Sequence, residues 1–596
     1  MKIKNHIKGA LMASVLAAGA LSCTNLDEIT FDRIDANIYY QNEGSVQGAV
    51  ASIYASAAAG FTEYFWYLNE FSADQIVWRT WYGGAWGWDE AEKFVLSTQT
   101  WTSESKIIQD AWEHAWETIG LCNTLINDLE SIEASAIGMN QDVLDSYIAE
   151  VRTLRAWAYY NNFELWGGAL PLNTSVGGEI PGSADVDFNK GCDVIWNFIN
   201  DELDACYEKL NKEDGSNATR TRINQATNRM LKMRLLLNSE LFTGTPRYTE
   251  CATLCEKIIN GDYGTYNLAG DYQDIYKTTN YTCPEVVFAF AMEEGRLDND
   301  RRTTPFTPLQ YEPMFGYQNT HTGWNCCCLA PSKDNTGTLV PNAGSEGAKS
   351  FIFDYGDKLG APFDRMNDKD IRKQPFKCDA AGNWTGMFLM GAQYNYETNE
   401  PFLADADLQD KPLIYVDQVG TFLGMGRPLE PVMSPRWGQT NSGFRPIKYP
   451  IYPASSGLNF SNAAQVEFRL AEVYYTLAEC RLRNGGSAKE LVNEVRQRYY
   501  ETADLAEIEK PGPGFNAFDL DWMLSEWGIE FLDEGRRRRT DLRRFDKFTQ
   551  GQWWFFGRAT ETDRELPAKR DRRYEWFPLP RVATMVNPGL VQNPNY

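Results

Sequence analysis

The residues best suited to chemistry lie in one short aromatic segment, residues 78–88. It reads WRTWYGGAWGW and holds four of the chain's 19 tryptophans, one tyrosine and three glycines. Glycines let the backbone turn sharply, so flat rings can stand clear of a scaffold. Indole and phenol rings offer large apolar faces at low conformational cost, and the C–H face of a sugar ring matches such a surface. The segment therefore predicts a carbohydrate site.

We expect at least two of these tryptophans to contact a ligand, while nearby polar groups fix its orientation through hydrogen bonds. Asn69 and Asp89 are close in sequence and could contribute. The alternative is that the rings pack in the core, because positions 78 and 81 could share a helical face and 86 and 88 a strand face. The predicted site residues are Trp78, Trp81, Tyr82, Trp86 and Trp88, with Asp74 and Arg79.

Catalytic motifs are missing from the sequence. The chain has three histidines and contains no nucleophile elbow, phosphate-binding loop, dinucleotide fingerprint or paired-histidine zinc motif. Two carboxylates would suffice for a glycoside hydrolase, which composition does not exclude. We nevertheless expect a binding protein and not an enzyme.

Two clusters could be taken for metal sites. Residues 326–328 are three cysteines, but neighbouring side chains of an extended segment point to opposite faces, so they suit one metal poorly. Asp405, Asp407 and Asp410 lack the glycine and terminal glutamate of a calcium loop. We interpret them as a solvated acidic loop, with calcium as the alternative, and we expect no metal and no cofactor.

Charged residues cluster near the C-terminus. Residues 536–539 are four arginines flanked by Asp533, Glu534 and Asp541, which favours a structural ion-pair network over a phosphate patch. We expect Arg152 and Arg155 to brace helix packing in the same way, with Glu150 or Glu472 as partner. The formal net charge of −24 excludes nucleic acid as a partner, because neutralising phosphates requires a basic surface.

The N-terminus has the layout of an export signal. Three lysines precede an apolar run, residues 10–21, which is too short to span a bilayer, and Ser22 and Cys23 follow. A small residue before cysteine resembles the acylation site of bacterial lipoproteins. We expect lipidation at Cys23, with an ordinary cleaved signal as the alternative. A lipid chain would anchor the mature protein to a membrane without inserting it.

Helical periodicity occupies both ends of the chain. Apolar residues three and four apart predict helices over 45–59, 105–132, 141–166, 187–210, 226–241, 248–259, 463–484, 487–500 and 519–534. Trp112, Trp116, Trp157 and Trp166 lie on or beside these stripes, and we expect them in the core. Successive helix pairs are consistent with degenerate tetratricopeptide-like repeats.

The predicted organisation is a signal peptide, 1–22, followed by one domain, 23–596. Within it we expect an N-terminal helical part, 23–261, with an aromatic loop, 61–101; a loop-rich insert, 262–460, with a strand at 286–290; and a C-terminal helical part and tail, 461–596. The predicted fold class is mostly α, a tetratricopeptide-like helix-pair scaffold with a large irregular loop-rich insert. So long an insert favours a functional surface.

Five separated motifs resemble those of one family, in the same order. They are AEVRTLRAWAYY with WGGALPL (149–160 and 166–172), FRLAEV (468–473), NEVRQR (493–498), IEF with EGR and TDLRR (529–544), and FPLP with NPGLVQNPNY (577–596). Together with CTNLDE at 23–28, they resemble the SusD/RagB family over nearly the whole chain.

This resemblance implies a helical, non-enzymatic lipoprotein on the outer membrane, exposed at the cell surface and anchored through Cys23. Its partners would be a glycan ligand and a SusC-like TonB-dependent transporter that takes the glycan up. The alternative is a RagB-like protein that captures peptides. In the family, ring contacts come both from the N-terminal loop and from the insert, which adds Tyr311, Tyr317 and Trp324 as expected site residues.

Overall fold

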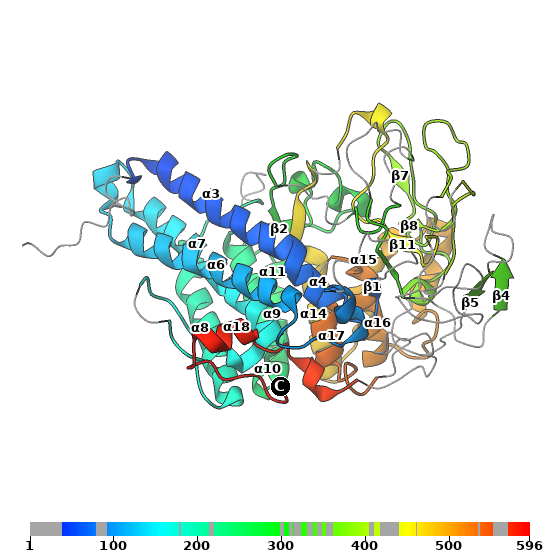
Figure 1. Ribbon diagram of the computed structural model, residues 1–596. Coiled ribbons are helices and arrows are strands. Elements are labelled where there is room, and N and C mark those ends of the chain that lie inside the picture. Colours follow the sequence, from blue (N-terminus) through cyan, green and yellow to red (C-terminus); the bar gives the residue numbers. More distant parts are fainter. Residues whose placement is uncertain are drawn as a thin grey trace, which may run out of the picture.

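The computed structural model describes residues 39–78, 92–177, 180–213, 220–297, 303–308, 314, 323–330, 338–341, 349–352, 362–404, 410–417, 440–459, 462–534, 537–551 and 570–596. Helices from both ends of the sequence form one scaffold, and the loop-rich insert lies at one end of it (Figure 1). The mostly helical fold predicted from the sequence is confirmed.

The N-terminal part of the scaffold is a set of amphipathic helices packed side by side. They are α3 (Glu43–Gly60), α6 (Lys106–Glu130), α7 (Gln141–Trp166), α8 (Phe188–Cys206), α9 (Gln225–Leu237), α10 (Ser239–Thr243) and α11 (Tyr248–Ile259). Three begin at polar caps that accept hydrogen bonds from the first turn: Asn140 for α7, Asp187 for α8 and Asn224 for α9. Helix α7 is central, being buried along most of its length between α6 and α8.

Charged side chains brace this part. Arg152 and Arg155 both pair with Glu202 on α8, at 2.6 and 2.8 Å. This corrects the expected partners, since Glu150 pairs instead with Arg222. Among the tryptophans expected in the core, Trp112, Trp157 and Trp166 are buried, which confirms them. Trp116 is only partly buried.

The C-terminal part pairs with the first strand of the insert and packs on a helix of the N-terminal part. Strand β12 (Gln465–Arg469) pairs antiparallel with β2 (Val286–Phe290), and α14 (Leu470–Arg483) packs on α11. Helices α15 (Lys489–Arg496), α16 (Leu520–Glu530), α17 (Arg538–Arg544) and α18 (Arg581–Val586) follow. The sequence predicted helix from 463, but the first residues alternate and pair with a distant strand, so the helix begins only at Leu470.

The insert is built from short strand pairs and turns. Its elements are β3 (Cys327–Leu329), β4 (Thr338–Pro341), β5 (Lys349–Ile352), α13 (Pro362–Arg365), β6 (Lys377–Cys378), β7 (Trp384–Thr385), β8 (Phe388–Leu389), β9 (Gly391–Ala392), β10 (Ile414–Tyr415) and β11 (Arg445–Pro446). Among the described residues each strand pairs with a single named partner, and β3 pairs outside the insert, with β1 (Ile76–Trp78).

The segment expected as an aromatic loop from residue 61 is helical at its start. A π-helical turn, Phe61–Phe65, and α4 (Trp66–Glu70) continue the chain after α3, and α5 (Phe94–Thr98) lies near its end. Burial explains the difference, because Phe65 packs edge-on against Trp166 of α7 and the Trp66 indole N–H donates to Asp533 Oδ1 at 2.9 Å. Phe65 and Trp66, at the start of this segment, are therefore part of the hydrophobic core.

Candidate functional site

The candidate site lies where the N-terminal aromatic segment meets the insert. Strands β1 and β3 pair antiparallel, with Trp78 opposite Cys327 and Ile76 opposite Leu329. This pairing brings two predicted site residues together: the rings of Trp78 and Trp324 have centroids 6.5 Å apart at 61°. The family resemblance implied ring contacts from both segments, and the structure places these two residues side by side.

Trp78 is the buried base of this pair. Its side chain is 1% exposed and packs on Tyr67 and Phe71, with ring centroids 5.7 and 5.2 Å away. Its backbone N–H donates to Ser97 Oγ at 2.8 Å. The prediction of an exposed Trp78 face is therefore wrong: the local sequence gives no sign that β3 and α4 enclose the ring.

Asp74 and Asn69 are also enclosed. The Arg538 guanidinium donates to both carboxylate oxygens of Asp74, at 2.7 and 2.9 Å, and Asp74 is 1% exposed. The Asn69 amide donates to Phe65 O at 3.0 Å. These groups serve the scaffold, which corrects the prediction that Asp74 contacts a ligand.

Trp324 keeps part of its ring exposed on a fixed backbone. The backbone N–H of Trp324 donates to Thr304 O at 2.7 Å, and the backbone N–H of Asn325 donates to Thr307 O at 2.9 Å. Asn325 is left-handed, with φ 50°, and its side chain accepts a hydrogen bond from buried Arg445 at 3.1 Å. On the other side, a Cβ on Gly323 would meet Pro308 O at 2.2 Å. These contacts fix the backbone from which the Trp324 side chain projects.

Lys93 is a neighbour that the sequence analysis missed. Its ammonium lies 5.1 Å from the ring centroid of Trp78 and 5.0 Å from that of Tyr67, in cation–π range. A single lysine just before a short helix carries no distinguishing pattern, so only the fold could reveal it. It places a positive charge over the rings of Trp78 and Tyr67.

The remaining predicted site residues lie outside the described residues. They are Arg79, Trp81, Tyr82, Trp86 and Trp88 from the N-terminal segment, Tyr311 and Tyr317 from the insert, with Asp89 and the lipidation site Cys23. Asp405 and Asp407 also fall there, while Asp410 is exposed and its N–H donates to Ala404 O at 2.9 Å. These predictions stand as predictions.

The three adjacent cysteines are fully buried. Cys327 and Cys328 belong to β3, and the sulfurs of Cys326 and Cys327 are 3.9 Å apart. Burial raises the pKa of Cys327, which keeps it a thiol, a poor metal ligand. Within the described ranges, no cluster of three histidine, cysteine or acidic side chains is arranged to hold a metal ion.

The described ranges contain no helix with the length and apolar character needed to cross a bilayer.

The arginine cluster is structural, as predicted for its described members. Arg537 pairs with Glu472 at 2.9 Å, and Arg538 pairs with Asp74. Arg539 is fully buried, and its guanidinium donates to backbone carbonyls, among them Glu575 O at 2.9 Å. One member of the predicted ligand site, Asp74, thus turns out to belong to the predicted ion-pair network.

Comparison with known proteins now decides the family. Residues 284–596 match the SusD family model, which covers more than half of the chain. The chain belongs to the SusD family. Over its full length it is 23% identical to the starch-binding protein SusD of Bacteroides thetaiotaomicron, covering 99% of that protein.

Solved structures of SusD-type proteins share the fold. A SusD superfamily protein from Parabacteroides distasonis aligns with a TM-score of 0.59 at 15% identity, over 93% of this chain and 99% of that one. Surface glycan-binding protein A from Bacteroides uniformis aligns with a TM-score of 0.59 at 16% identity, with the same coverage of both chains. At such identities the likeness concerns the fold alone.

Proposed function

We propose that this SusD-family protein binds a glycan at the bacterial cell surface and delivers it to a SusC-like TonB-dependent transporter. A lipid on Cys23 anchors it to the outer membrane. Support comes from family membership and from two relatives, one named a starch-binding protein and one a surface glycan-binding protein. The protein binds its ligand without cleaving it.

The observation that carries the proposal is the exposed part of Trp324, seated on Trp78. A sugar ring lays its C–H face on a flat indole, and the fixed backbone around Trp324 means that little entropy is lost on binding. Trp78 supports the platform from below. The ligand's hydroxyls then find polar partners around the ring. The net charge of −24 favours neutral glycans over anionic ones.

Calorimetry against a panel of neutral polysaccharides tests the platform. With the polysaccharide that binds, Trp324→Ala is expected to weaken affinity at least tenfold, about 1.4 kcal/mol, and Trp324→Phe to weaken it less. Tyr394, an exposed aromatic residue of the same insert, provides the control, and Tyr394→Ala is expected to bind normally. Unchanged binding by Trp324→Ala would remove the platform from the proposal.

Purification of the complex from native outer membranes tests the ligand class. Mass spectrometry of the material that co-purifies is expected to find oligosaccharide. Bound peptide would favour the RagB-like alternative instead, and release of reducing sugar by the purified protein would contradict a purely binding role.

A further inference from the structure

The most exposed apolar side chains lie in two short segments, and three of them line one groove. In the part of the chain that the structure describes, every large hydrophobic residue that is at least half exposed lies in one of two segments, 180–186 and 582–586. They are Ile180, Val186, Val582, Met585 and Val586, with Val186 82% and Val586 78% exposed. Such clustering marks an interaction surface, since isolated exposed hydrophobics are ordinarily scattered.

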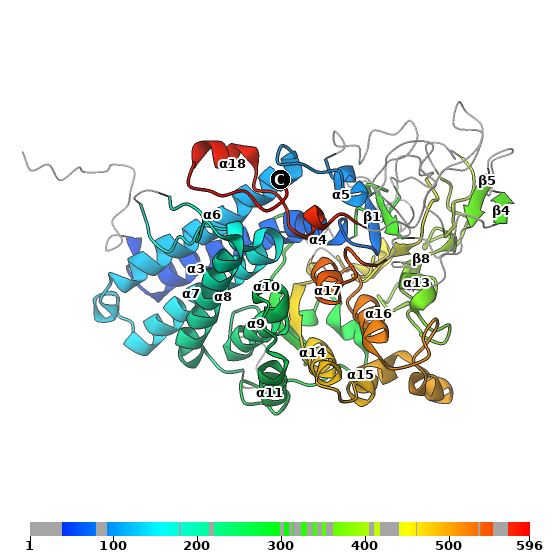
Figure 2. The same cartoon turned by 90° about the horizontal axis from the view of Figure 1, so that it is seen from below.

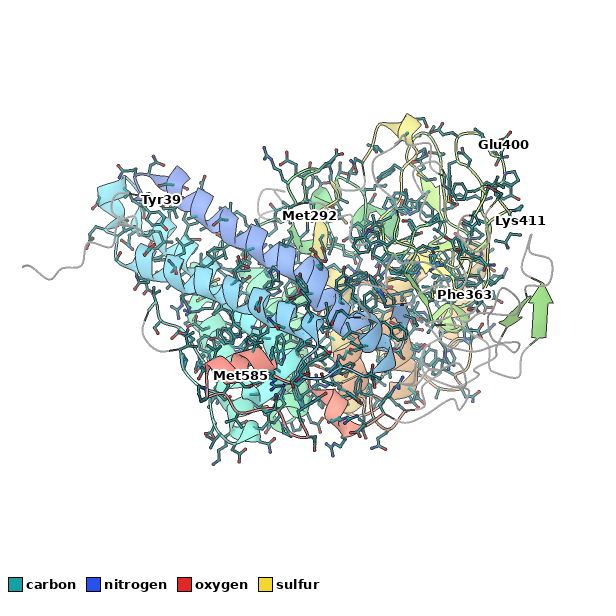
Figure 3. The ribbon with its side chains drawn as sticks, in the orientation of Figure 1. Tyr39, Met292, Phe363, Glu400, Lys411 and Met585 are labelled. Carbon is teal, nitrogen blue, oxygen red and sulfur yellow. The ribbon has the colours of Figure 1, made fainter. Side chains whose placement is uncertain are left out.

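The first segment lies against residues 587–589, which directly follow the second segment. Ser183 N–H donates to Gly589 O at 3.1 Å, and the Asn587 amide donates to Pro181 O at 2.9 Å. The backbones nearly touch, because a Cβ on Gly182 would meet Gly589 O at 2.3 Å. Figure 2 shows α18 at the outer edge of the scaffold beside α6, and Figure 3 labels Met585 there.

A groove of about 490 Å³ opens between these segments and α6. Its α6 side is formed by Trp112, Trp116 and Ile119, and its other wall by Val582 and Val586 of α18, with Ile180 at one end. The two indoles pack edge to face, with centroids 5.4 Å apart. We call this surface the α6–α18 groove. Its shape and lining suit apolar side chains that project from another surface.

The charges around the groove select its occupant. Glu113 is the charged residue among those that line it, Glu117 lies one turn further along α6, and Asp185 and Asp187 flank Val186. Arg581 is already paired with Glu104. A twofold contact joins the same patch on two copies, so a second copy of this chain would place acidic residues against acidic residues. An anionic lipid surface would be repelled by the same residues. A different protein with basic flanks fits.

We infer that the α6–α18 groove docks a different protein chain, which inserts apolar side chains between α6 and α18 and places lysine or arginine beside Glu113. This inference rests on the proposed function, in which that chain is the transporter. The groove lies on the helical scaffold, and the ligand site lies at the β1–β3 pair, so the two can be tested separately.

Photo-crosslinking in the outer membrane tests the inference on the full-length, lipidated protein produced with its transporter. A photoreactive amino acid at Met585 is expected to form one adduct, identified as the transporter by mass spectrometry. The same probe at Tyr394, an exposed position in the insert, is expected to form none. An adduct of two copies, a lipid adduct alone, or no adduct at Met585 would overturn the inference.

A second measurement uses surface variants that leave the core intact. Val582→Asn with Val586→Asn is expected to lower the yield of co-purified transporter at least tenfold, and Glu113→Lys to lower it through charge. Glycan affinity of the isolated variants is expected to remain normal. If the transporter co-purifies undiminished with all variants, the groove is not its docking surface. If instead the proposed function is wrong, the unaltered protein itself will bind no glycan, which distinguishes that outcome from failure of the docking inference.

Discussion

Asp74 and Arg538 form a buried two-point ion pair that ties the chain just before β1 to the C-terminal helices. Arg538 Nε and Nη2 lie 2.7 and 2.9 Å from the two carboxylate oxygens, and the side chain of Asp74 is fully buried. The same guanidinium donates to Leu524 O of α16 at 2.8 Å. The pair therefore positions β1, and with it the base of the candidate site.

Asp74→Ala is expected to lower the free energy of unfolding by about 3–5 kcal/mol, because it leaves the buried Arg538 charge without its partner. Chemical denaturation measures the loss. Asp201, an exposed aspartate on α8, is the control, and Asp201→Ala is expected to stay within about 0.5 kcal/mol. Full stability combined with lost glycan binding would instead make Asp74 a ligand contact.

Trp78→Ala is expected to cost about 3–5 kcal/mol of stability, because it opens a cavity between Tyr67, Phe71 and Trp324. Trp324→Ala is expected to cost less, since part of its ring is already in water. Thermal unfolding of the two variants measures the difference. Equal stability of Trp78→Ala and the unaltered protein would show that the indole is not part of the core.

The helices could be predicted from sequence because their signals are local. Helix α7 begins and ends where the apolar stripe predicts, and α11 likewise matches its predicted bounds. Partners distant in sequence could not be predicted. The strand that precedes α14 depends on β2, and the carboxylate that pairs with Arg152 lies on α8.

The candidate site shows the same division. Aromatic composition drew attention to residues 78–88, and the family resemblance added Trp324, whose ring lies beside that of Trp78. That these rings contact a ligand stays a prediction. Trp78 is buried because Tyr67, Phe71 and Trp324 pack around its ring, and no pattern within residues 78–88 encodes these contacts. The same holds for the charged residues. Asp74 was predicted to contact a ligand, but its partner Arg538 is distant in sequence and comes next to it only in the fold.

Glu479 is expected to make stability depend on pH in the acid range. Burial alone would raise the pKa of its carboxyl, but Arg544 and Arg483 lower it from 4.5 to about 2. A lowered pKa stabilises the fold above the unfolded value, and this contribution is lost as pH falls from about 4.5 toward 2. The difference is on the order of 3 kcal/mol.

Glu479→Gln, which mimics the protonated group, is therefore expected to cost most above pH 5 and progressively less toward pH 2. Melting temperatures measured over that range follow the change. Glu256, whose pair with Arg481 is exposed, is the control, and Glu256→Gln is expected to cost little at any pH. A penalty for Glu479→Gln that does not change with pH would contradict the ion-pair explanation.

Gly168 allows the 3-10 turn that follows α7, Gly167–Ala169, to meet α8 closely at the WGGALPL motif. A Cβ at this position would lie 1.8 Å from Phe188 O, the first residue of α8, and one on Gly191 would lie 2.2 Å from Gly168 O. Because both obstacles are backbone atoms, they can yield only if the helix moves. Gly168→Ala is expected to lower stability by about 3 kcal/mol or more, measured by thermal unfolding.

Gly48 is the matched control, since it lies within α3, is exposed, and has open space around the position of a Cβ. Gly48→Ala is expected to raise stability by about 0.5–1 kcal/mol, because alanine loses less backbone entropy in a helix. Opposite signs for the two substitutions would attribute the loss at Gly168 to the close helix contact. If both variants are stabilised, the turn after α7 and helix α8 are not in close contact through Gly168 and Gly191.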